Sequence, residues 1–236
     1  MEKIKWNGKN KAVTFSYDDG VKQDARLIGL FDKYSLRSTF NINSGLLSRD
    51  GSLIREGVRV DHSKWTPEEV REVYKGHEVA VHTLTHPNLC DLSREDVIRE
   101  VDGDRVRLSE IVGRDVVGMA YPGGGVNCNQ SVADTVRTET PLKYARTTIA
   151  TNDFEIQDDL FLFKPTVHHA NFGDLFELLK KFVDLKTDEP KLFYIWGHSY
   201  EFDIDDSWGL FEDFLKGISL RDDIFYGTNA EVFGLV

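Results

Sequence analysis

The chain has few cysteines and no long apolar run. Of its 236 residues only 2 are cysteine, and Cys90 and Cys128 do not form a CxxC pair. We expect two reduced thiols, with a single disulfide between them as the alternative. No apolar stretch approaches the ~20 residues that a membrane-spanning helix needs. These shortages exclude a disulfide-stapled miniprotein and a helical membrane protein.

Basic residues are also scarce relative to acidic ones. The chain has 29 Lys and Arg against 40 Asp and Glu, a formal net charge of −11. A nucleic-acid partner requires a basic surface that displaces counterions from phosphate, so we expect none. The same charge disfavours an anionic membrane surface. The first residues, MEKIKWNGKNKAVTF, carry charge but no apolar signal-peptide segment, which favours a cytoplasmic protein over a trimmed secreted one.

What the chain does have is a regular alternation of strand and helix patterns. Helical patterns with caps or apolar stripes occupy 25–31, 66–76, 93–111, 173–185 and 208–216, and Asp102-Gly103-Asp104 interrupts the third. The alternation predicts parallel βαβ units, and its length suits one domain, 1–236, built as a (β/α) barrel. Polar loops are expected at 43–65 and 147–159. Strands are predicted at 11–17, 37–42, 77–82, 116–121, 142–146, 160–164, 191–197 and 223–227.

Side chains capable of chemistry follow several of these strands. In a (β/α) barrel the carboxyl ends of all strands lie on one face, where active sites are built. We therefore expect these side chains to converge on one cavity, although some lie about 180 positions apart in the sequence. They are Asp18 and Asp19 after the first strand, His82 and His86 after the third, Tyr121 after the fourth and His198 after the late strand 191–197.

The pair His82 and His86 favours a metal site when it is combined with Asp18-Asp19-Gly20. Residues four apart share a face of a helical turn, and two imidazoles with one carboxylate are a catalytic zinc ligand set. Each motif alone has a plainer explanation, solvated histidines or a simple turn. One aspartate completes the ligands. The other is then free to act as general base on water whose pKa the metal lowers to roughly 7.

Four stretches of the chain resemble the motifs of a known family. TFSYDDG (14–20) resembles the first motif of polysaccharide deacetylases, the NodB-homology group of carbohydrate esterase family 4. GHEVAVHTLTHPNL (76–89) is similar to the second motif, H-[ST]-x-x-H. AYPGG (120–124) resembles the third motif, and YIWGHS (194–199) the late motif with its single histidine. The resemblance spans residues 12–198 in the family's order.

The resemblance implies a deformed (β/α) barrel of about seven parallel strands. It also implies a metal-dependent hydrolase that removes acetyl groups from N-acetylated or O-acetylated carbohydrate. One divalent ion is expected, zinc by default, with cobalt, nickel, iron or manganese as alternatives. By motif position the metal ligands would be Asp19, His82 and His86, and the catalytic residues would be Asp18 as base, His198 as acid and Tyr121, whose backbone N–H would face the oxyanion.

Substrate contacts are expected around the third and late motifs. Tyr121, Pro122 and Gly123 would line the substrate site, and the ring of Trp196 could stack on a sugar. Two features of the family are missing from the sequence. The stretch VVGMAYPGG holds no arginine to steady the base, and Arg114 is the nearest upstream candidate.

The second missing feature is the fourth motif, which would supply a partner for His198. Asp153, Asp158 and Asp159 are the candidates, and the acidic run from Glu201 to Asp206 is interpreted as a solvated loop. His168 and His169 are interpreted as satisfied or solvated side chains, and His62 as a residue of the long loop after the second strand.

Two other functions fit parts of the sequence. The same barrel and metal could hydrolyse a non-sugar amide or a cyclic ureide, in which case ammonia or ureide products would replace acetate. Alternatively, the barrel could serve as a carbohydrate-binding or regulatory protein without turnover. The presence of every expected catalytic and ligand residue favours the enzyme.

Overall fold

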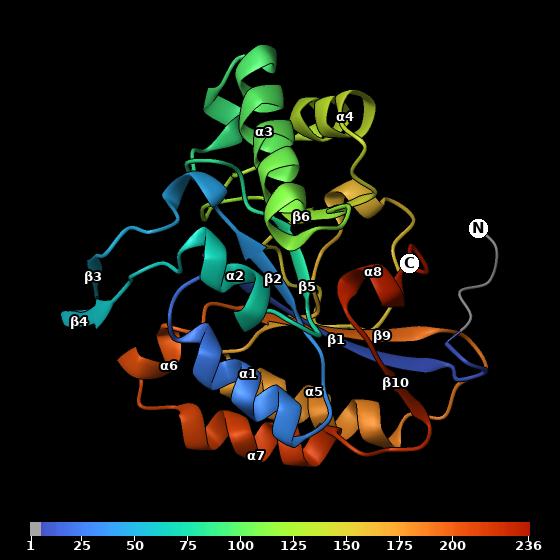
Figure 1. Cartoon of the computed structure of the whole chain (residues 1–236). Helices are drawn as coiled ribbons and strands as arrows, with labels where there is room; N and C mark the ends of the chain where they lie inside the picture. Colours follow the sequence, from blue (N-terminus) through green and yellow to red (C-terminus); the bar gives the residue numbers. More distant parts are fainter. Residues whose placement is uncertain (1–5) are drawn as a thin grey trace.

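A computed structural model describes residues 6–236, and its centre is a curled sheet of parallel strands (Figure 1). The strands follow the order β7-β6-β5-β2-β1-β9-β8, with β10 beside the first part of β1. Their bounds are β1 (Lys11–Asp18), β2 (Thr39–Ile42), β5 (Glu78–Val81), β6 (Gly118–Ala120), β7 (Tyr144–Arg146), β8 (Val167–His168), β9 (Lys191–Gly197) and β10 (Ile224–Tyr226).

The two ends of this sheet approach each other through one connecting segment. Arg146 of β7 pairs in parallel with Phe163, and the Thr166 N–H donates to the Tyr194 carbonyl of β9 at 2.9 Å. The segment between β7 and β8 therefore spans the gap that an open sheet would leave. This arrangement confirms the predicted deformed (β/α) barrel of about seven parallel strands.

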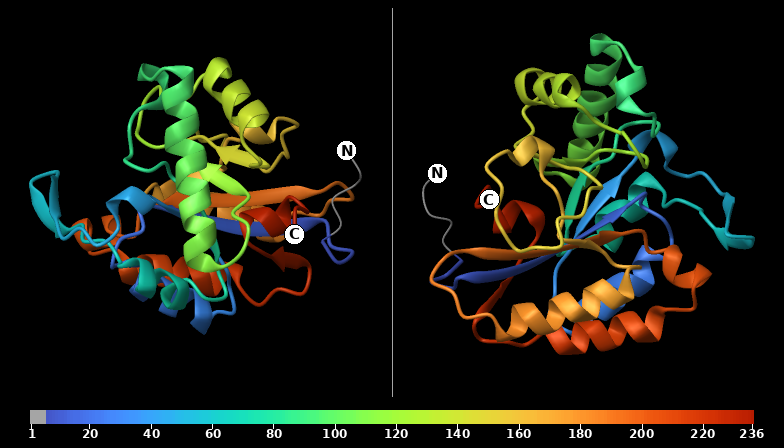
Figure 2. Two further views of the ribbon diagram at one scale, coloured as in Figure 1. Left: turned by 45° about the horizontal axis from the view of Figure 1, so that its top comes forward. Right: turned by 180° about the vertical axis from the view of Figure 1, so that it is seen from behind.

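Helices cover the outside of the barrel in two groups (Figure 2). One group packs along β1 and β9, and the other stands beside β5 and β6. The first group is α1 (Asp24–Lys33), α5 (Phe172–Asp184) and α7 (Trp208–Ile218), and the second is α2 (Pro67–Val73), α3 (Arg94–Val112) and α4 (Gln130–Glu139). Two short helices, α6 (Glu201–Ile204) and α8 (Asn229–Val232), follow β9 and β10.

Alternate residues of the central strands divide the core into two layers. Val13, Phe15 and Tyr17 of β1 belong to the large cluster under the helices, whereas Ala12 belongs to a second cluster. On β9, Leu192, Tyr194 and Trp196 join the second cluster while Phe193 and Ile195 join the first. Period-two burial on both faces is what a parallel strand between helices and a barrel interior requires.

Three local predictions were wrong. The helix α3 continues through Asp102-Gly103-Asp104, because Asp104 is fully buried with partners for its carboxylate and Leu84 fills the space beside Gly103. The predicted strand 160–164 is mostly the 3-10 turn η3 (Leu160–Leu162). Asp159 begins this turn by accepting from the Phe161 N–H, which takes that N–H out of any strand ladder.

The predicted loop 43–65 holds a two-stranded antiparallel hairpin, β3 (Ser52–Arg55) and β4 (Val58–Asp61). Its turn is Glu56-Gly57, with φ of 54° and 82°, as the tight turn of a hairpin needs. Figure 1 shows the hairpin projecting from the barrel. Both cysteines are free, and no helix among residues 6–236 is long and apolar enough to cross a membrane.

Candidate metal centre and active site

The carboxyl ends of four strands carry the side chains that the sequence singled out. Asp18 ends β1, His82 follows β5, Tyr121 follows β6 and His198 follows β9. Because these strands run parallel in one curled sheet, all four ends lie at the same end of the barrel.

Asp19, His82 and His86 form a compact group of possible metal ligands. The Oδ1 atom of Asp19 lies 3.7 Å from Nε2 of His82 and 3.5 Å from Nε2 of His86. One potential ligand atom from each residue lies within 4.8 Å of the others. The three residues that we predicted as ligands are therefore brought together.

The environment of His82 suits a metal ligand. Its Nδ1–H donates to the Ala120 carbonyl at 2.9 Å, which leaves the lone pair on Nε2. That Nε2 is buried and has no hydrogen-bond partner in residues 6–236. Burial lowers the pKa of His82 to about 4, so the ring stays neutral. A neutral histidine anchored through one nitrogen with the other nitrogen bare is the arrangement of metal-binding histidines.

The loops that carry these ligands have a strained backbone. Asp19, Thr83 and His86 have φ values of 82°, 69° and 63°, in the left-handed region that residues other than glycine seldom adopt. Such conformations persist only where surrounding contacts hold them, and they are concentrated at functional sites.

Two carboxylates of α3 supply those contacts. Asp104 accepts from the backbone N–H of Ser44 at 2.7 Å and from that of His82 at 3.1 Å. Glu100 accepts from the Thr85 N–H at 2.9 Å and from the Thr85 hydroxyl at 3.0 Å. Burial raises the pKa of Asp104 to about 8 despite these bonds. The loop of residues 82–86 is thus held by side chains of α3.

Asp19 has partners on its other side as well. His62 Nε2 lies 3.2 Å from Oδ2 of Asp19, and Lys64 Nζ donates to the Asp19 carbonyl at 2.7 Å. Burial alone would raise the pKa of Asp19, but His62, Lys64 and nearby imidazoles bring it well below its usual range. The carboxylate therefore stays ionised. His62 was interpreted as a loop residue, and the β3–β4 hairpin is what brings it here.

Asp18 is held by an arginine that the sequence analysis missed. Arg146 Nη2 lies 2.5 Å from the Asp18 carboxylate, and the Asn41 amide donates to it at 2.8 Å. Burial would raise the pKa of Asp18, but Arg146, His82 and His198 lower it overall. The candidate Arg114 instead donates to the His77 carbonyl, away from this site. Arg146 is the last residue of the predicted strand 142–146, of which residues 144–146 form β7.

Tyr121 occupies a different role from the one predicted. Its backbone N–H donates to the Arg146 carbonyl at 3.0 Å, and its hydroxyl donates to the Phe161 carbonyl at 2.8 Å. Tyr121 continues the pairing of β6 with β7, so its N–H is not directed toward an oxyanion. Pro122 is buried beside it, whereas Gly123 is exposed, with its carbonyl bonded to the Asn127 amide at 2.9 Å.

Trp196 lines the inside of the barrel and is 8% exposed. Its ring covers the guanidinium of Arg146, with the Cζ atom 4.5 Å from the ring centroid. This packing leaves little of the ring for the predicted sugar contact. Its clear role in the structure is to shield the ion pair of Arg146 with Asp18 from water.

His198 has a carboxylate partner, but not one of those predicted. Nδ1 of His198 lies 3.3 Å from Oε2 of Glu201. Burial would lower the pKa of His198, but Glu201, Asp19 and Asp18 raise it to about 9. Glu201 is 4% exposed, so its interpretation as part of a solvated loop was wrong. The candidate Asp159 instead caps η3.

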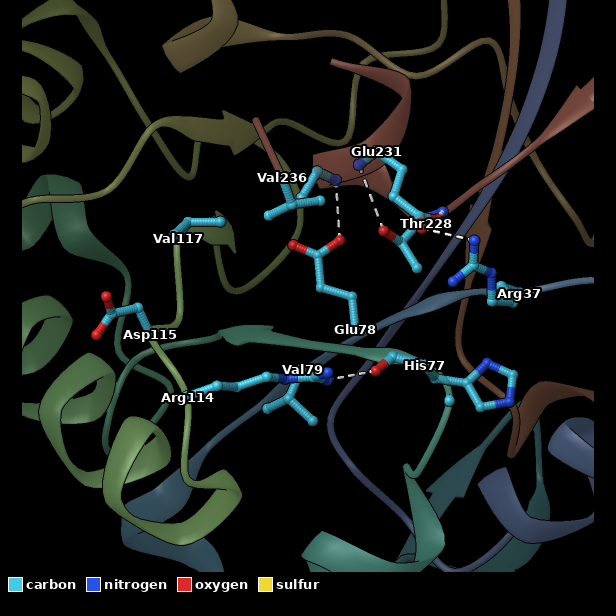
Figure 3. A pocket seen from close by; sticks show the side chains of 12 residues that line it. Arg37, His77, Glu78, Val79, Arg114, Asp115, Val117, Thr228, Glu231 and Val236 are labelled. Carbon is cyan, nitrogen blue, oxygen red and sulfur yellow. Dashed lines mark hydrogen bonds and ion pairs between the residues drawn. The ribbon is translucent and has the colours of Figure 1, made fainter. Parts of the chain in front are cut away.

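A pocket of about 330 Å³ lies at the opposite end of the barrel (Figure 3). Arg37, Glu78 and Arg114 line it, near the amino ends of β5 and β6. The Glu78 carboxylate there is satisfied by Thr39, Tyr144 and the Ala230 N–H. The pocket shares no residue with the candidate site.

Comparisons with solved structures agree with this fold. The chain is 15% identical to a family 4 acetyl xylan esterase from Clostridium thermocellum in complex with a cobalt ion, with a TM-score of 0.57 over 95% of this chain and 91% of that one. It is 16% identical to the Xyl-CE4 domain of a multidomain xylanase from the hindgut metagenome of Trinervitermes trinervoides, with a TM-score of 0.58 over 95% and 90% of the two chains.

A third similar structure is BC0361, a polysaccharide deacetylase from Bacillus cereus. The identity is 19% and the TM-score 0.50, over 63% of this chain, which spans only 44% of the length of BC0361. A search of curated proteins gave no match. The sequence profile of the polysaccharide deacetylase family matches residues 5–140, more than half of the chain. The chain therefore belongs to the polysaccharide deacetylase family, the family of hydrolases that its motifs resemble.

Proposed function

We propose that this chain is a metal-dependent hydrolase that removes acetyl groups from N-acetylated or O-acetylated carbohydrate. The observation that carries the proposal is the convergence of two units at one end of the barrel. One unit is the ligand group of Asp19, His82 and His86, and the other is the buried ion pair of Asp18 with Arg146. Family membership supports the choice of substrate.

Asp19, His82 and His86 would hold one divalent ion. Two imidazoles and one carboxylate leave coordination positions open, as catalytic zinc sites do, and zinc is the ion we propose. Cobalt, nickel, iron and manganese also accept this ligand set. When bound, the ion would polarise the acetyl carbonyl and lower the pKa of water.

Asp18 would act as the general base. It is ionised, because Arg146 and the neighbouring imidazoles outweigh its burial, and both of its oxygens lie close to the guanidinium. The Asn41 amide fixes the carboxylate further. A base held rigidly in one orientation can accept a proton from the attacking water without reorganising.

His198 would act as the general acid. An amine leaves a tetrahedral intermediate readily only after protonation, so the acid must carry a proton when the C–N bond breaks. Because the pKa of His198 is raised to about 9, the ring is protonated at neutral pH. Base and acid are separate groups, and each is in the protonation state that its role requires.

An acetate-release panel tests this function. Metal-stripped and zinc-restored protein would be incubated with chito-oligosaccharide and acetylated xylan, beside Asp18→Asn and His82→Ala. We expect His82→Ala to lose metal and activity together, whereas Asp18→Asn keeps the metal and loses turnover. Equal acetate release by the zinc-restored wild type, Asp18→Asn and His82→Ala would refute the mechanism. Release of ammonia from a ureide in place of acetate would indicate the amide or ureide hydrolase. Binding of carbohydrate without any product would indicate a carbohydrate-binding protein.

A further inference from the structure

We infer that Glu201 is a positioning residue that holds His198 through Nδ1 and leaves Nε2 to deliver the proton. This inference rests on the proposed function, because it assigns a partner to the proposed acid. In the fold, Glu201 opens α6, three residues after His198 and one turn beyond the end of β9.

The carboxylate of Glu201 is surrounded by donors. Its Oε2 lies 3.2 Å from Nε2 of His168, 3.3 Å from Nε2 of His169 and 3.3 Å from Nδ1 of His198. The backbone N–H of His198 also donates to Oε2, at 3.1 Å. On the other side, Arg55 Nη1 lies 2.6 Å from Oε1. The carboxylate is ionised, since the rings of His198, His168 and His169 outweigh burial and lower the pKa of Glu201 far below its ordinary value.

The protonation of His168 follows from its backbone contact. The Ala170 N–H donates to Nδ1 of His168 at 3.2 Å, so that nitrogen carries a lone pair. In a neutral imidazole the proton then resides on Nε2, the atom that faces Glu201. Nε2 is therefore the nitrogen of His168 that can donate, and it lies 3.2 Å from Oε2 of Glu201.

His169 is arranged in the same way. Its Nδ1 lies 3.1 Å from the hydroxyl of Tyr17, a group whose pKa is raised by burial and which therefore stays protonated. Burial also lowers the pKa of His169 to about 4, so the ring is neutral. With the Tyr17 hydroxyl as the donor to Nδ1, the proton of the neutral ring lies on Nε2, which is 3.3 Å from Oε2 of Glu201. Gly197 leaves room for the His169 ring, because a Cβ at position 197 would lie 2.3 Å from Nδ1 of His169.

These two imidazoles lie against Oε2 of Glu201, although Nε2 of His169 makes no hydrogen bond of good geometry among residues 6–236, and Glu201 in turn lies beside His198. Among residues 6–236, buried Nδ1 of His198 has no hydrogen-bond partner of good geometry, and Oε2 of Glu201 is the carboxylate oxygen within reach. A proton on Nδ1 stabilises the contact, so the second, exchangeable proton belongs to Nε2. This is how a carboxylate sets the tautomer and orientation of a catalytic imidazole.

The same atoms could be mistaken for a second metal site. His168, His198 and Glu201 each offer a ligand atom within 4.8 Å of the others. A metal on Nε2 of His168 would force a proton onto its Nδ1, against the Ala170 N–H. It would also place a cation beside the guanidinium of Arg55. Both contacts oppose a metal, so the cluster consists of donors around an anion.

The charged groups around His198 define what a titration should show. Glu201 on α6 and the carboxylates of Asp18 and Asp19 after β1 favour its protonated form. The groups beyond Glu201 are Arg55 on the hairpin and the rings of His168 and His169. Removing the charge of Glu201 while keeping its shape therefore isolates the largest favourable contact.

The experiment compares wild type, Glu201→Gln, Glu201→Asp and the exposed control Glu177→Gln. The ¹⁵N signals of His198 would be titrated in metal-free protein, and acetate release by zinc-restored protein would be measured against pH. We expect Glu201→Gln to lower the pKa of His198 by at least ~1 unit and kcat at pH 8 by ~10- to 100-fold, with KM within about twofold. Relative to Glu201→Gln, Glu201→Asp should restore part of the His198 pKa and part of kcat. Glu177→Gln should match wild type.

Three results would overturn the inference. One is a His198 titration unchanged in Glu201→Gln, and another is a wild-type His198 whose Nδ1 carries no proton at neutral pH. The third is a second equivalent of bound zinc that Glu201→Gln abolishes. The wild-type ¹⁵N spectrum needs no variant to fold and no substrate. Failure of the proposed function would show as absent acetate release, independently of these readouts.

Discussion

The guanidinium of Arg146 lies 2.5 Å from the carboxylate of Asp18, although the two residues are 128 positions apart in the chain. Their side chains are 0% and 2% exposed. The pair joins β7 to β1 across the interior of the barrel, and Trp196 covers it. An ion pair this deeply buried is costly to break, because either partner left alone is an uncompensated charge.

Arg146→Met tests this relationship. We expect the free energy of unfolding to fall by ~3–5 kcal/mol and acetate release to fall by at least ~100-fold, since Asp18 loses both its counter-charge and its orientation. Urea denaturation and initial rates would measure the two effects. The exposed Arg137, paired with Asp134 and Asp159 at the surface, provides the control, and Arg137→Met should cost no more than ~1 kcal/mol. If Arg146→Met changed neither the free energy of unfolding nor the rate of acetate release, the role that we assign to Arg146 would be contradicted.

The pH dependence of activity should reflect His198. Its pKa is raised from 6.5 to about 9. The acid form therefore persists through neutral pH, and kcat/KM should fall only as the pH approaches 9. The matching contribution to stability is full below pH 6.5 and disappears between 6.5 and about 9, because the unfolded ring has already lost its proton there. A rate profile that falls near pH 6.5 would remove His198 from the role of acid.

Asp104 should control the metal site without touching the metal. Asp104→Ala leaves the buried N–H of Ser44 without its acceptor, at a cost of ~1–3 kcal/mol, and leaves the N–H of His82 with the Ile42 carbonyl alone. We expect zinc affinity to fall by ~10- to 100-fold, measured with a competing chelator. Asp104→Asn retains one acceptor oxygen and should lose less. Asp102→Ala, on the same helix, should leave zinc affinity unchanged, and an equal loss there would point to general damage to α3.

His62 should orient Asp19. Its Nε2 contacts Oδ2 of Asp19, whereas His82 and His86 lie nearest to Oδ1. His62→Ala should weaken zinc binding by ~10-fold or more, as loss of a group that orients a ligand does, and should leave the fold intact. Calorimetric titration with zinc would measure this. Unchanged zinc affinity in His62→Ala would show that His62 does not orient Asp19.

Metal binding should stabilise the folded chain. Zinc at 100 times its dissociation constant adds ~2.7 kcal/mol to the free energy of unfolding, which for a chain of this size is roughly 5–10 °C in melting temperature. His86→Ala should abolish the shift. His77→Ala should retain it, since His77 accepts from the Ser38 N–H away from the ligand group. A shift that survives in His86→Ala would place the metal elsewhere.

The family resemblance and most strands could be read from the sequence because their signals are local. Residues 191–197 form β9 with the bounds that were predicted, and Thr66 and Ser93 cap α2 and α3 as expected. The positions of Asp18, Asp19, His82, His86 and His198 at strand ends followed from the parallel alternation alone. The spacing of apolar residues, the helix caps and the strand ends depend on neighbours in the chain, so a short stretch of sequence reveals them.

The partners of those residues were decided by the tertiary structure. Arg146 reaches Asp18 only because β7 faces β1 across the barrel, and the Tyr121 N–H is occupied only because β6 pairs with β7. Glu201 is buried among charged and polar partners because Arg55, on a hairpin 146 positions away, and His168 and His169 at the end of β8 meet beside it. Which charges meet depends on strand order and on how far the sheet curls. Both are properties of the whole packed core, which no short stretch of sequence encodes.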